Sequence, residues 1–247
     1  MGGGHIQALV QLSKLKGIGV TEIVFEALPY TIALTASGIG WAIALGVPLG
    51  CWSAIHRETW LDRIVGVLAV AAIAVPSFVV ALYALLLFAV ELNWLPAIGA
   101  GARGNLGDQL AHLVLPSFAI GLGWVGYLAR LVRASMLEVL GENHIRTARA
   151  YGLPERRIVF RYALRLAVLP TVALLGVGIG NLLSGAVFAE IVFARPGEGK
   201  LVFDAVVTRN FPVVSGAVLV TTALFALCTL AADLVIAWLD PRVRANL

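Results

Sequence analysis

Long apolar stretches alternate with short charged ones along this chain. A helix that crosses roughly 30 Å of hydrocarbon at about 1.5 Å per residue needs about 20 apolar residues. The intervals that meet this requirement and contain no Asp, Glu, Lys or Arg are 27–55, 64–90, 109–129, 166–189 and 210–232. The pattern therefore predicts an all-α polytopic membrane protein with about five transmembrane helices.

Prolines and glycines inside the apolar intervals are compatible with this prediction. Membrane helices tolerate proline because neighbouring groups satisfy the freed carbonyls. The prolines within or near the ends of the intervals are Pro48, Pro76, Pro116 and Pro170. The glycine-rich run at 176–185 predicts a place where helices approach closely.

The composition excludes a soluble protein. The chain is 60% hydrophobic and 13% charged, with a mean hydropathy of +0.93, whereas soluble domains are about half apolar and about a quarter charged. The pI of 9.4 does not indicate nucleic-acid binding, because the basic residues fall between membrane-length segments rather than on a soluble surface.

Arginine and lysine collect in alternate loops, which predicts the orientation of the chain in the membrane. Twelve arginines lie in the segments 56–63, 130–165 and 240–247, whereas 91–108 and 190–209 together hold four basic residues. Basic residues concentrate on the cytoplasmic side of membrane proteins. We therefore expect the first set of segments in the cytoplasm and the second set outside.

The longest polar interval, 130–165, cannot lie in hydrocarbon, because each arginine at the bilayer centre costs at least about 2.5 kcal/mol. Its sequence predicts two short helices joined by a tight corner. The run HIRTARAY favours a helix, Gly152 suits the left-handed residue that ends it, and Pro154 suits the first turn of the next helix. We expect a compact, basic helical projection between two spans.

This projection resembles a known family motif. The sequence ARAYGLPERRIVFRYALRLAVLP at 148–170 is similar to the cytoplasmic coupling motif of permease subunits from the dipeptide, oligopeptide and nickel class of ABC importers. Further segments that resemble this class, in the family's order, are 61–78, 112–140, 192–216 and 239–244. The resemblance extends over most of the chain.

The chain departs from the family pattern in two places. In the wider superfamily the motif begins Glu-Ala-Ala, with glycine three residues later. Here Arg146, Thr147 and Ala148 hold those places, and Gly152 follows four residues after Ala148. Arginine at the first of these positions is common in the peptide branch of the superfamily, so this departure favours assignment to that branch. Family members also usually begin with an additional spanning helix and an external segment, so the family expectation is six spans where this sequence supports five.

The resemblance implies the fold of a type I ABC importer permease in the cell (inner) membrane of a prokaryote. The sequence itself predicts an interfacial or external lead-in over 1–26. The resemblance implies a transmembrane permease domain over 27–247, with a cytoplasmic coupling segment over 141–165. The substrate would be a short peptide, nickel or another small solute. The implied partners are a second homologous permease, two cytoplasmic ATPases, an extracytoplasmic binding protein and the lipid bilayer, with no nucleic acid. ATP would be used by the ATPases, so this chain would bind no cofactor and catalyse no reaction.

In that family, the short helix before the glycine sits in a groove on an ATPase subunit. The residues to which the resemblance gives a coupling role are Arg146, Thr147, Ala148, Arg149, Ala150, Gly152, Glu155, Arg156 and Arg157. Gly152 would permit the corner, the two alanines would allow close approach, and the arginines would pair with acidic groups on the partner. For any single arginine, the alternative is that it only holds the loop inside or contacts lipid phosphates.

The segment GEGK at 197–200 is similar to the end of a phosphate-binding loop but fails as a nucleotide site. Ala194 stands where the first glycine is required, and Leu201 stands where Ser or Thr should follow the lysine. The family comparison implies an external loop that dips into the translocation path or faces the binding protein. The residues that are candidates for such contacts are Glu190, Arg195, Asp204 and Arg209, and an ordinary solvated-loop role stays open for each.

Nothing in the sequence predicts a catalytic or metal site. Cys51 and Cys228 each lie in an apolar stretch and are expected to be small apolar fillers. The histidines, His5, His56, His112 and His144, have no metal-ligand spacing. We find no Ser–His–Asp, Cys–His or paired-carboxylate arrangement.

Two other function classes would each need particular residues inside the membrane. An ion-coupled secondary transporter needs buried ionisable residues near mid-membrane, and Asp233 is the one acid close to the interior of a span. An interfacial or cavity-facing structural role is the simpler interpretation of that residue. An intramembrane enzyme needs a catalytic pair within the spans, and the sequence offers none.

Overall fold

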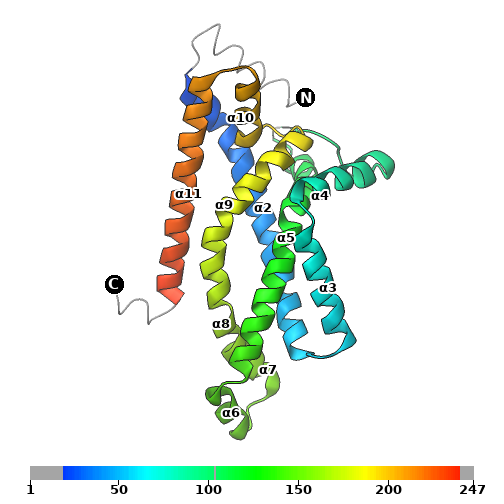
Figure 1. The fold of residues 1–247 in the computed structure, drawn as a ribbon, viewed down its shortest axis with the longest axis vertical. Coiled ribbons are helices and arrows are strands. Elements are labelled where there is room, and N and C mark those ends of the chain that lie inside the picture. The colour runs from blue at the N-terminus through cyan, green and yellow to red at the C-terminus, as the bar shows by residue number, and fades with distance from the viewer. Residues whose placement is uncertain (1–18, 103, 240–247) are drawn as a thin grey trace. The chain divides into compact units, whose positions relative to one another are not determined.

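The computed structural model describes residues 19–102 and 104–239, and every regular element in this part of the chain is helical (Figure 1). The helices are α2 (Val20–Ile55), α3 (Trp60–Ala74), α4 (Ser77–Ala84), the π-helix η1 (Leu85–Glu91), α5 (Leu106–Leu140), α6 (Asn143–Ala150), α7 (Glu155–Arg157), the π-helix η2 (Ile158–Ala163), α8 (Leu164–Ala167), α9 (Leu169–Val192), α10 (Glu198–Val207) and α11 (Phe211–Leu239). The all-α prediction is confirmed. His5, Lys14, Lys16, Asp240 and the terminal arginines lie outside the described residues.

Within residues 19–102 and 104–239, four helices are long and apolar enough to cross a membrane, and a fifth span results if the two helices on either side of residue 76 count as one. The four are Val20–Ile55, Leu106–Leu140, Glu155–Gly176 and Phe211–Val235. The predicted interval 64–90 is thus interrupted, because Pro76 stands at the N-cap of α4 with φ −60° and ψ 141° and cannot donate a backbone hydrogen bond. Pro116 lies inside α5 without ending it. The prediction of about five spans is consistent with this count.

The chain divides into two compact units. The first unit holds the described residues up to Gly40 together with Val75–Gly121 and Ile179–Leu227. The second unit holds Trp41–Ala74, Leu122–Gly178 and the described residues from Cys228 onward. Each unit contains one candidate site.

In the second unit, small residues let α2 approach α5 closely. A Cβ atom added to Gly50 would lie 2.5 Å from the carbonyl oxygen of Ala129, and one added to Gly46 would lie 3.0 Å from that of Val125. Real Cβ atoms essentially never come as close as 2.5 Å, so only glycine fits at position 50, and the contact at position 46 is tighter than most real Cβ contacts. The predicted role of the 176–185 run is also confirmed, since a Cβ on Gly178 would collide with the ring of Trp124.

The first unit has two apolar cores. One joins Ile23, Val24 and Ala27 of α2 to α10 and α11 through Leu201 and Val213. The other joins α4 and η1 to α5, and its buried members include Ala81, Ala84, Ala89, Leu115, Ala119 and Phe193. These cores fix α10 against the start of α2, which positions the buried polar residues described below.

Many large apolar side chains remain on the surface of both units. Exposed examples are Val67, Leu68, Leu219, Leu227 and Leu234, each more than 60% exposed. Soluble monomers rarely expose apolar surface on this scale. The pattern fits helices whose outer faces contact lipid.

Candidate functional site

The predicted corner at Gly152 is present, and its hydrogen bonds explain why a glycine is needed. Gly152 has φ +73°, and α6 ends just before it. The amide of Leu153 donates to the carbonyl of Ala148 (3.2 Å), and the amide of Gly152 donates to that of Arg149 (2.9 Å). This pair of bonds defines a Schellman motif, whose left-handed residue is most often glycine. The motif ends α6 and reverses the chain toward Pro154, which lies at the N-cap of α7.

The inner face of this hairpin is anchored on the core of the second unit. Ile145, Ala148 and Ile158 are buried in one cluster with Val132 and Met136 of α5. Leu153 packs against the same cluster, which supplies the apolar contact that commonly accompanies a Schellman motif. Figure 1 shows α6 and α7 at the end of α5. The hairpin therefore packs against the helices from which it projects.

Arg149 and Glu155 tie the two arms of the hairpin together. The Nε and Nη2 atoms of Arg149 donate to the two carboxylate oxygens of Glu155 at 2.7 and 3.3 Å. This bidentate contact raises the pKa of Arg149 above its usual value. Arg149 is thus already paired within this chain, so a contact between Arg149 and a partner subunit would have to form beside this ion pair or replace it.

The other predicted coupling residues differ in their exposure. Ala148 is 7% exposed and packs in the chain's own core, and its predicted part in the close approach of a partner stays a prediction. The residues on the outer surface are Arg146, Thr147, Ala150, Gly152, Arg156 and Arg157. Among the described residues, Arg146, Arg156 and Arg157 form no ion pair.

A cavity of about 410 Å³ lies between the hairpin and the ends of α2 and α5. Its lining residues include the apolar Ile55, Leu137 and Val159 and the basic Arg57 and Arg146. Arg149 and Glu155 line it as well. The lining thus combines apolar side chains with charged ones.

Sequence reasoning missed an ion pair beside this hairpin. The Nε and Nη2 atoms of Arg133 in α5 donate to the carboxylate oxygens of Asp62 in α3, at 2.6 and 2.7 Å. Asp62 also accepts from the Ser53 hydroxyl in α2 and from the amide of Glu58 (3.0 Å). One buried carboxylate therefore connects α2, α3 and α5. Asp62 opens an apolar run, which was the one signal available in the sequence.

A buried polar cluster in the first unit is built around Glu190. This residue is 0% exposed. Its Oε1 atom accepts from the hydroxyl of Thr31 (2.6 Å), and its Oε2 atom accepts from the amides of Gly199 (2.8 Å) and Lys200 (3.2 Å). These amides belong to the first turn of α10, which otherwise has no acceptor for them. Glu190 therefore caps α10 from the end of α9.

The glycines of the GEGK segment leave room for this carboxylate. A Cβ atom on Gly197 would lie 2.1 Å from the Cδ atom of Glu190, and one on Gly199 would lie 2.6 Å from the Cα atom of Val187. The amides of Gly199 and Lys200 in this segment donate to Glu190. Its glycines serve close packing against α9.

Three of the four predicted external-loop residues are buried. Glu190, Arg195 and Asp204 are 0%, 3% and 7% exposed, and only Arg209 lies on the surface. The solvated-loop interpretation is wrong for the three buried residues, because the chain folds over them. Asp204 forms an ion pair with Lys200 one turn earlier in α10 (3.0 Å). Whether any of the four contacts a substrate stays a prediction.

Arg195 and Glu198 are buried charges outside the membrane-spanning helices. Burial lowers the pKa of the Arg195 guanidinium and raises the pKa of the Glu198 carboxyl. The Nη1 atom of Arg195 donates to the carbonyl of His112 (3.3 Å), and its Nε atom is buried without a partner among the described residues. Glu198, which is 1% exposed, was not singled out in the sequence because it looked like an ordinary loop acid.

Among residues 19–102 and 104–239, no group of three or more His, Cys, Asp or Glu side chains is placed to hold a metal. Cys51 is buried in the core of the second unit, as expected of an apolar filler. Asp233 lies on the exposed side of α11.

A comparison with protein families decides the class. The family described as "Binding-protein-dependent transport system inner membrane component" matches residues 46–245. The chain belongs to this family. It is accordingly a multi-pass component of the inner membrane, and the apolar helices described above are its membrane part.

Individual relatives agree with the family. A peptide permease protein of Brucella suis biovar 1 (strain 1330) is 39% identical over 230 residues, which cover 92% of this chain and 72% of the relative. The glutathione transport system permease protein GsiC of Pectobacterium atrosepticum is 38% identical over 223 residues (90% and 70%), and that of Escherichia coli (strain K12) is 36% identical (90% and 70%).

A solved structure confirms the fold. A chain of the MetNI methionine ABC transporter in an inward-facing conformation aligns with a TM-score of 0.73 at 20% identity, covering 89% of this chain and 97% of the other. The predicted ABC importer permease fold is thereby confirmed.

Proposed function

We propose that this chain is the transmembrane permease subunit of an ATP-driven importer of short peptides or peptide-like solutes such as glutathione, and that the 146–165 segment couples it to a cytoplasmic ATPase. The family and the names of the relatives support the transport role and the substrate class. The observation that carries the coupling role is the hairpin itself. It is packed on its own helices through one face, and on the other it presents arginines that form no ion pair with the described residues.

The proposed partners are a second homologous permease, two ATPase subunits and an extracytoplasmic binding protein. ATP would bind to the ATPases, and this chain would catalyse no reaction. Because the hairpin shares a core with α5 and α2, a displacement imposed on it by closing ATPases would move those helices as well. Alternating access to the translocation path would follow from this movement in the two permeases.

The geometry divides the coupling residues into two groups. Gly152, Arg149 and Glu155 would hold the corner of the hairpin, since the glycine closes the Schellman motif and the ion pair joins its arms. Arg146, Arg156 and Arg157 would contact acidic groups of the ATPase, because they are exposed and form no ion pair within the described chain.

The test is uptake and copurification in the assembled importer. Arg146→Glu and Arg156→Glu should each reduce ATP-driven uptake at least tenfold and reduce the amount of ATPase that copurifies, while the protein stays in the membrane. Arg63→Glu is the matched control, because Arg63 is an exposed cation of the same unit outside the hairpin. Uptake that continues in vesicles lacking any ATPase, driven by an ion gradient, would overturn the proposal.

A charge swap separates the two groups of residues. Arg149→Glu alone should impair uptake, because it puts two carboxylates at the corner. Arg149→Glu combined with Glu155→Arg should restore most of it, because the ion pair re-forms with its ends exchanged. If the double variant stays as impaired as the single one, Arg149 acts on the partner rather than on the corner.

A further inference from the structure

The Asp62 carboxylate holds the start of α3 next to the core that carries the hairpin. It is 7% exposed and accepts hydrogen bonds from Ser53 of α2 and Arg133 of α5. Each of these donors is the immediate sequence neighbour of a core residue, since Ala54 and Val132 are buried in the cluster that holds the inner face of the hairpin. Asp62 thus brings α3 to the core that α2 and α5 share with the hairpin.

The contacts of α3 with α5 are of two kinds. All residues of α3 are described, and none contributes a side chain to the hairpin core. Its buried residues are Asp62 and Ala69. A Cβ atom added to Gly126 of α5 would lie 2.5 Å from the carbonyl oxygen of Ala69, so the two helices touch there through small groups without a directional bond. The ion pair of Asp62 lies two turns away, about 10 Å at about 1.5 Å per residue.

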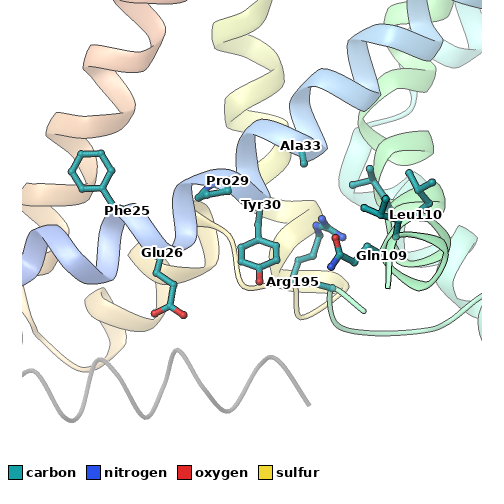
Figure 2. A pocket seen from close by; sticks show the side chains of 11 residues that line it. Phe25, Glu26, Pro29, Tyr30, Ala33, Gln109, Leu110 and Arg195 are labelled. Atoms are coloured by element: carbon teal, nitrogen blue, oxygen red, sulfur yellow. The ribbon is translucent and has the colours of Figure 1, made fainter. Parts of the chain in front are cut away.

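The geometry of this ion pair is that of a fixed link. Arg133 donates through its Nε and Nη2 atoms to the two oxygens of Asp62 at 2.6 and 2.7 Å, and a bidentate contact of this kind restricts both distance and angle. Arg195 of the first unit shows the contrast. It donates to the carbonyl of His112 at 3.3 Å, its Nε atom has no partner among the described residues, and Figure 2 shows it among the side chains that line a cavity of about 520 Å³. Arg133 therefore holds α3 to α5 as a single long hydrogen bond would not.

Stability alone does not explain why charged residues occupy this place. Removing two charges from water is costly, and apolar residues of similar volume often stabilise a fold equally well. Apolar contacts, however, allow helices to slide and turn against each other, whereas a bidentate ion pair resists both movements. α3 is one half of the bent helix pair that counts as a fifth span, so a movement passed to it reaches the membrane part of the permease.

We propose that the ion pair between Asp62 and Arg133 is the link through which a displacement of the hairpin reaches α3, with the contact of Ala69 and Gly126 as the pivot. Asp62 and Arg133 are positioning residues, which act through the helices that they join. This link rests on the proposed function, since it assumes that ATPases displace the hairpin. Without the ion pair, the ATPases would still bind and hydrolyse ATP, but α3 would follow the hairpin less closely. More ATP would then be hydrolysed for each molecule transported.

The experiment measures the number of ATP molecules hydrolysed per trialanine taken up, in proteoliposomes that hold the complete importer and its binding protein. This ratio should rise at least about fivefold in Asp62→Asn, while the amount of copurified ATPase stays unchanged. A loss of folded importer lowers hydrolysis and uptake together, so a purely structural role would not move the ratio. Arg133→Lys should raise the ratio less, because it keeps the charge without the fork. Arg130→Gln is the matched control, since it removes an exposed cation one turn earlier in α5, and it should leave the ratio unchanged.

The double variant Asp62→Asn, Arg133→Met separates the link from folding. It leaves no unpaired charge, so its Tm should be close to that of the wild type, and its ratio should stay raised. A ratio at the wild-type value in this double variant overturns the link and shows that the ion pair serves folding. Loss of copurified ATPase from the double variant also overturns it, because the ion pair would then shape the docking surface. Trialanine uptake that needs no ATP in the wild type overturns the proposed function together with the link, so the two failures are distinguishable.

Discussion

Replacing Gly152 with alanine isolates the backbone conformation of the hairpin corner. Gly152 has φ +73°, and a Cβ atom added there would meet nothing within 4 Å. The substitution therefore creates no collision, and its whole cost is that of placing an L-residue in the left-handed region, about 1–2 kcal/mol. That cost corresponds to an increase of about 5- to 30-fold in the population of the opened corner.

Hydrogen exchange measures this population directly. The amides of Gly152 and Leu153 are held by the two Schellman bonds, so their exchange in the purified importer should accelerate about 5- to 30-fold in Gly152→Ala. Gly152→Asn should show a smaller acceleration, because asparagine enters the left-handed region more readily. Uptake should fall in the same order if the corner transmits ATPase movement.

Gly66→Ala provides the matched control. Gly66 also has open space around its Cβ position but lies inside α3 with an ordinary helical φ. Alanine there should leave exchange in the hairpin unchanged and should stabilise α3 by up to about 1 kcal/mol. Exchange of the Gly152 and Leu153 amides at the wild-type rate in Gly152→Ala would refute the argument from the left-handed conformation.

Three further predictions concern the packing and the buried charges. Asp62→Ala should lower the free energy of unfolding by about 2–3 kcal/mol, because Arg133 loses its partner. The double variant Asp62→Ala, Arg133→Leu should lose less stability than the sum of the losses in the two single variants. Additive losses in thermal or denaturant unfolding would contradict this. Gly50→Val should prevent stable folding, since its Cβ would lie 2.5 Å from the carbonyl oxygen of Ala129, and a wild-type elution profile in size-exclusion chromatography would show that the helices separate without cost. The raised pKa of Glu198 means that the folded chain binds this proton more tightly than the unfolded chain, so its stabilising contribution is complete below about pH 4.3 and is lost as the pH rises through the raised value. Glu198→Gln should therefore raise the Tm relative to the wild type more at pH 8 than at pH 5, and an equal shift at both pH values would exclude this linkage.

The hairpin and the interiors of the units assign different tasks to arginines that look alike in the sequence. Arg146 and Arg156 are exposed, so removing them should alter binding of a partner rather than folding of this chain. Arg133 and Arg195 are held inside their units by carboxylate or carbonyl oxygens. Substitutions of the two exposed arginines should therefore alter association with the ATPase, whereas substitutions of the other two should alter the permease itself.

The one-dimensional pattern determined the helical class, the approximate number of spans and the position of the hairpin corner. These features follow from local rules: a span needs a fixed length of apolar residues, and a helix that ends in the left-handed region needs glycine. By the same rules, Pro76 was expected to be tolerated within a helix rather than to break it. Local rules do not distinguish Pro76 from Pro116, which lies inside α5 and leaves that helix intact. Neighbouring groups, which the sequence does not display, decide between these two outcomes.

Tertiary structure alone decided what each charged residue does. The loop acids and bases Glu190, Arg195 and Asp204 appeared solvated because charge usually seeks water, yet the chain folds α10 over them. Asp62 and Arg133 are 71 positions apart, so no local spacing could pair them. Burial and partnership depend on which distant segments meet, whereas span length and helix ends depend on neighbours along the chain, and this is why the sequence revealed the scaffold of the permease while the structure was needed to locate its buried charges and its cavity.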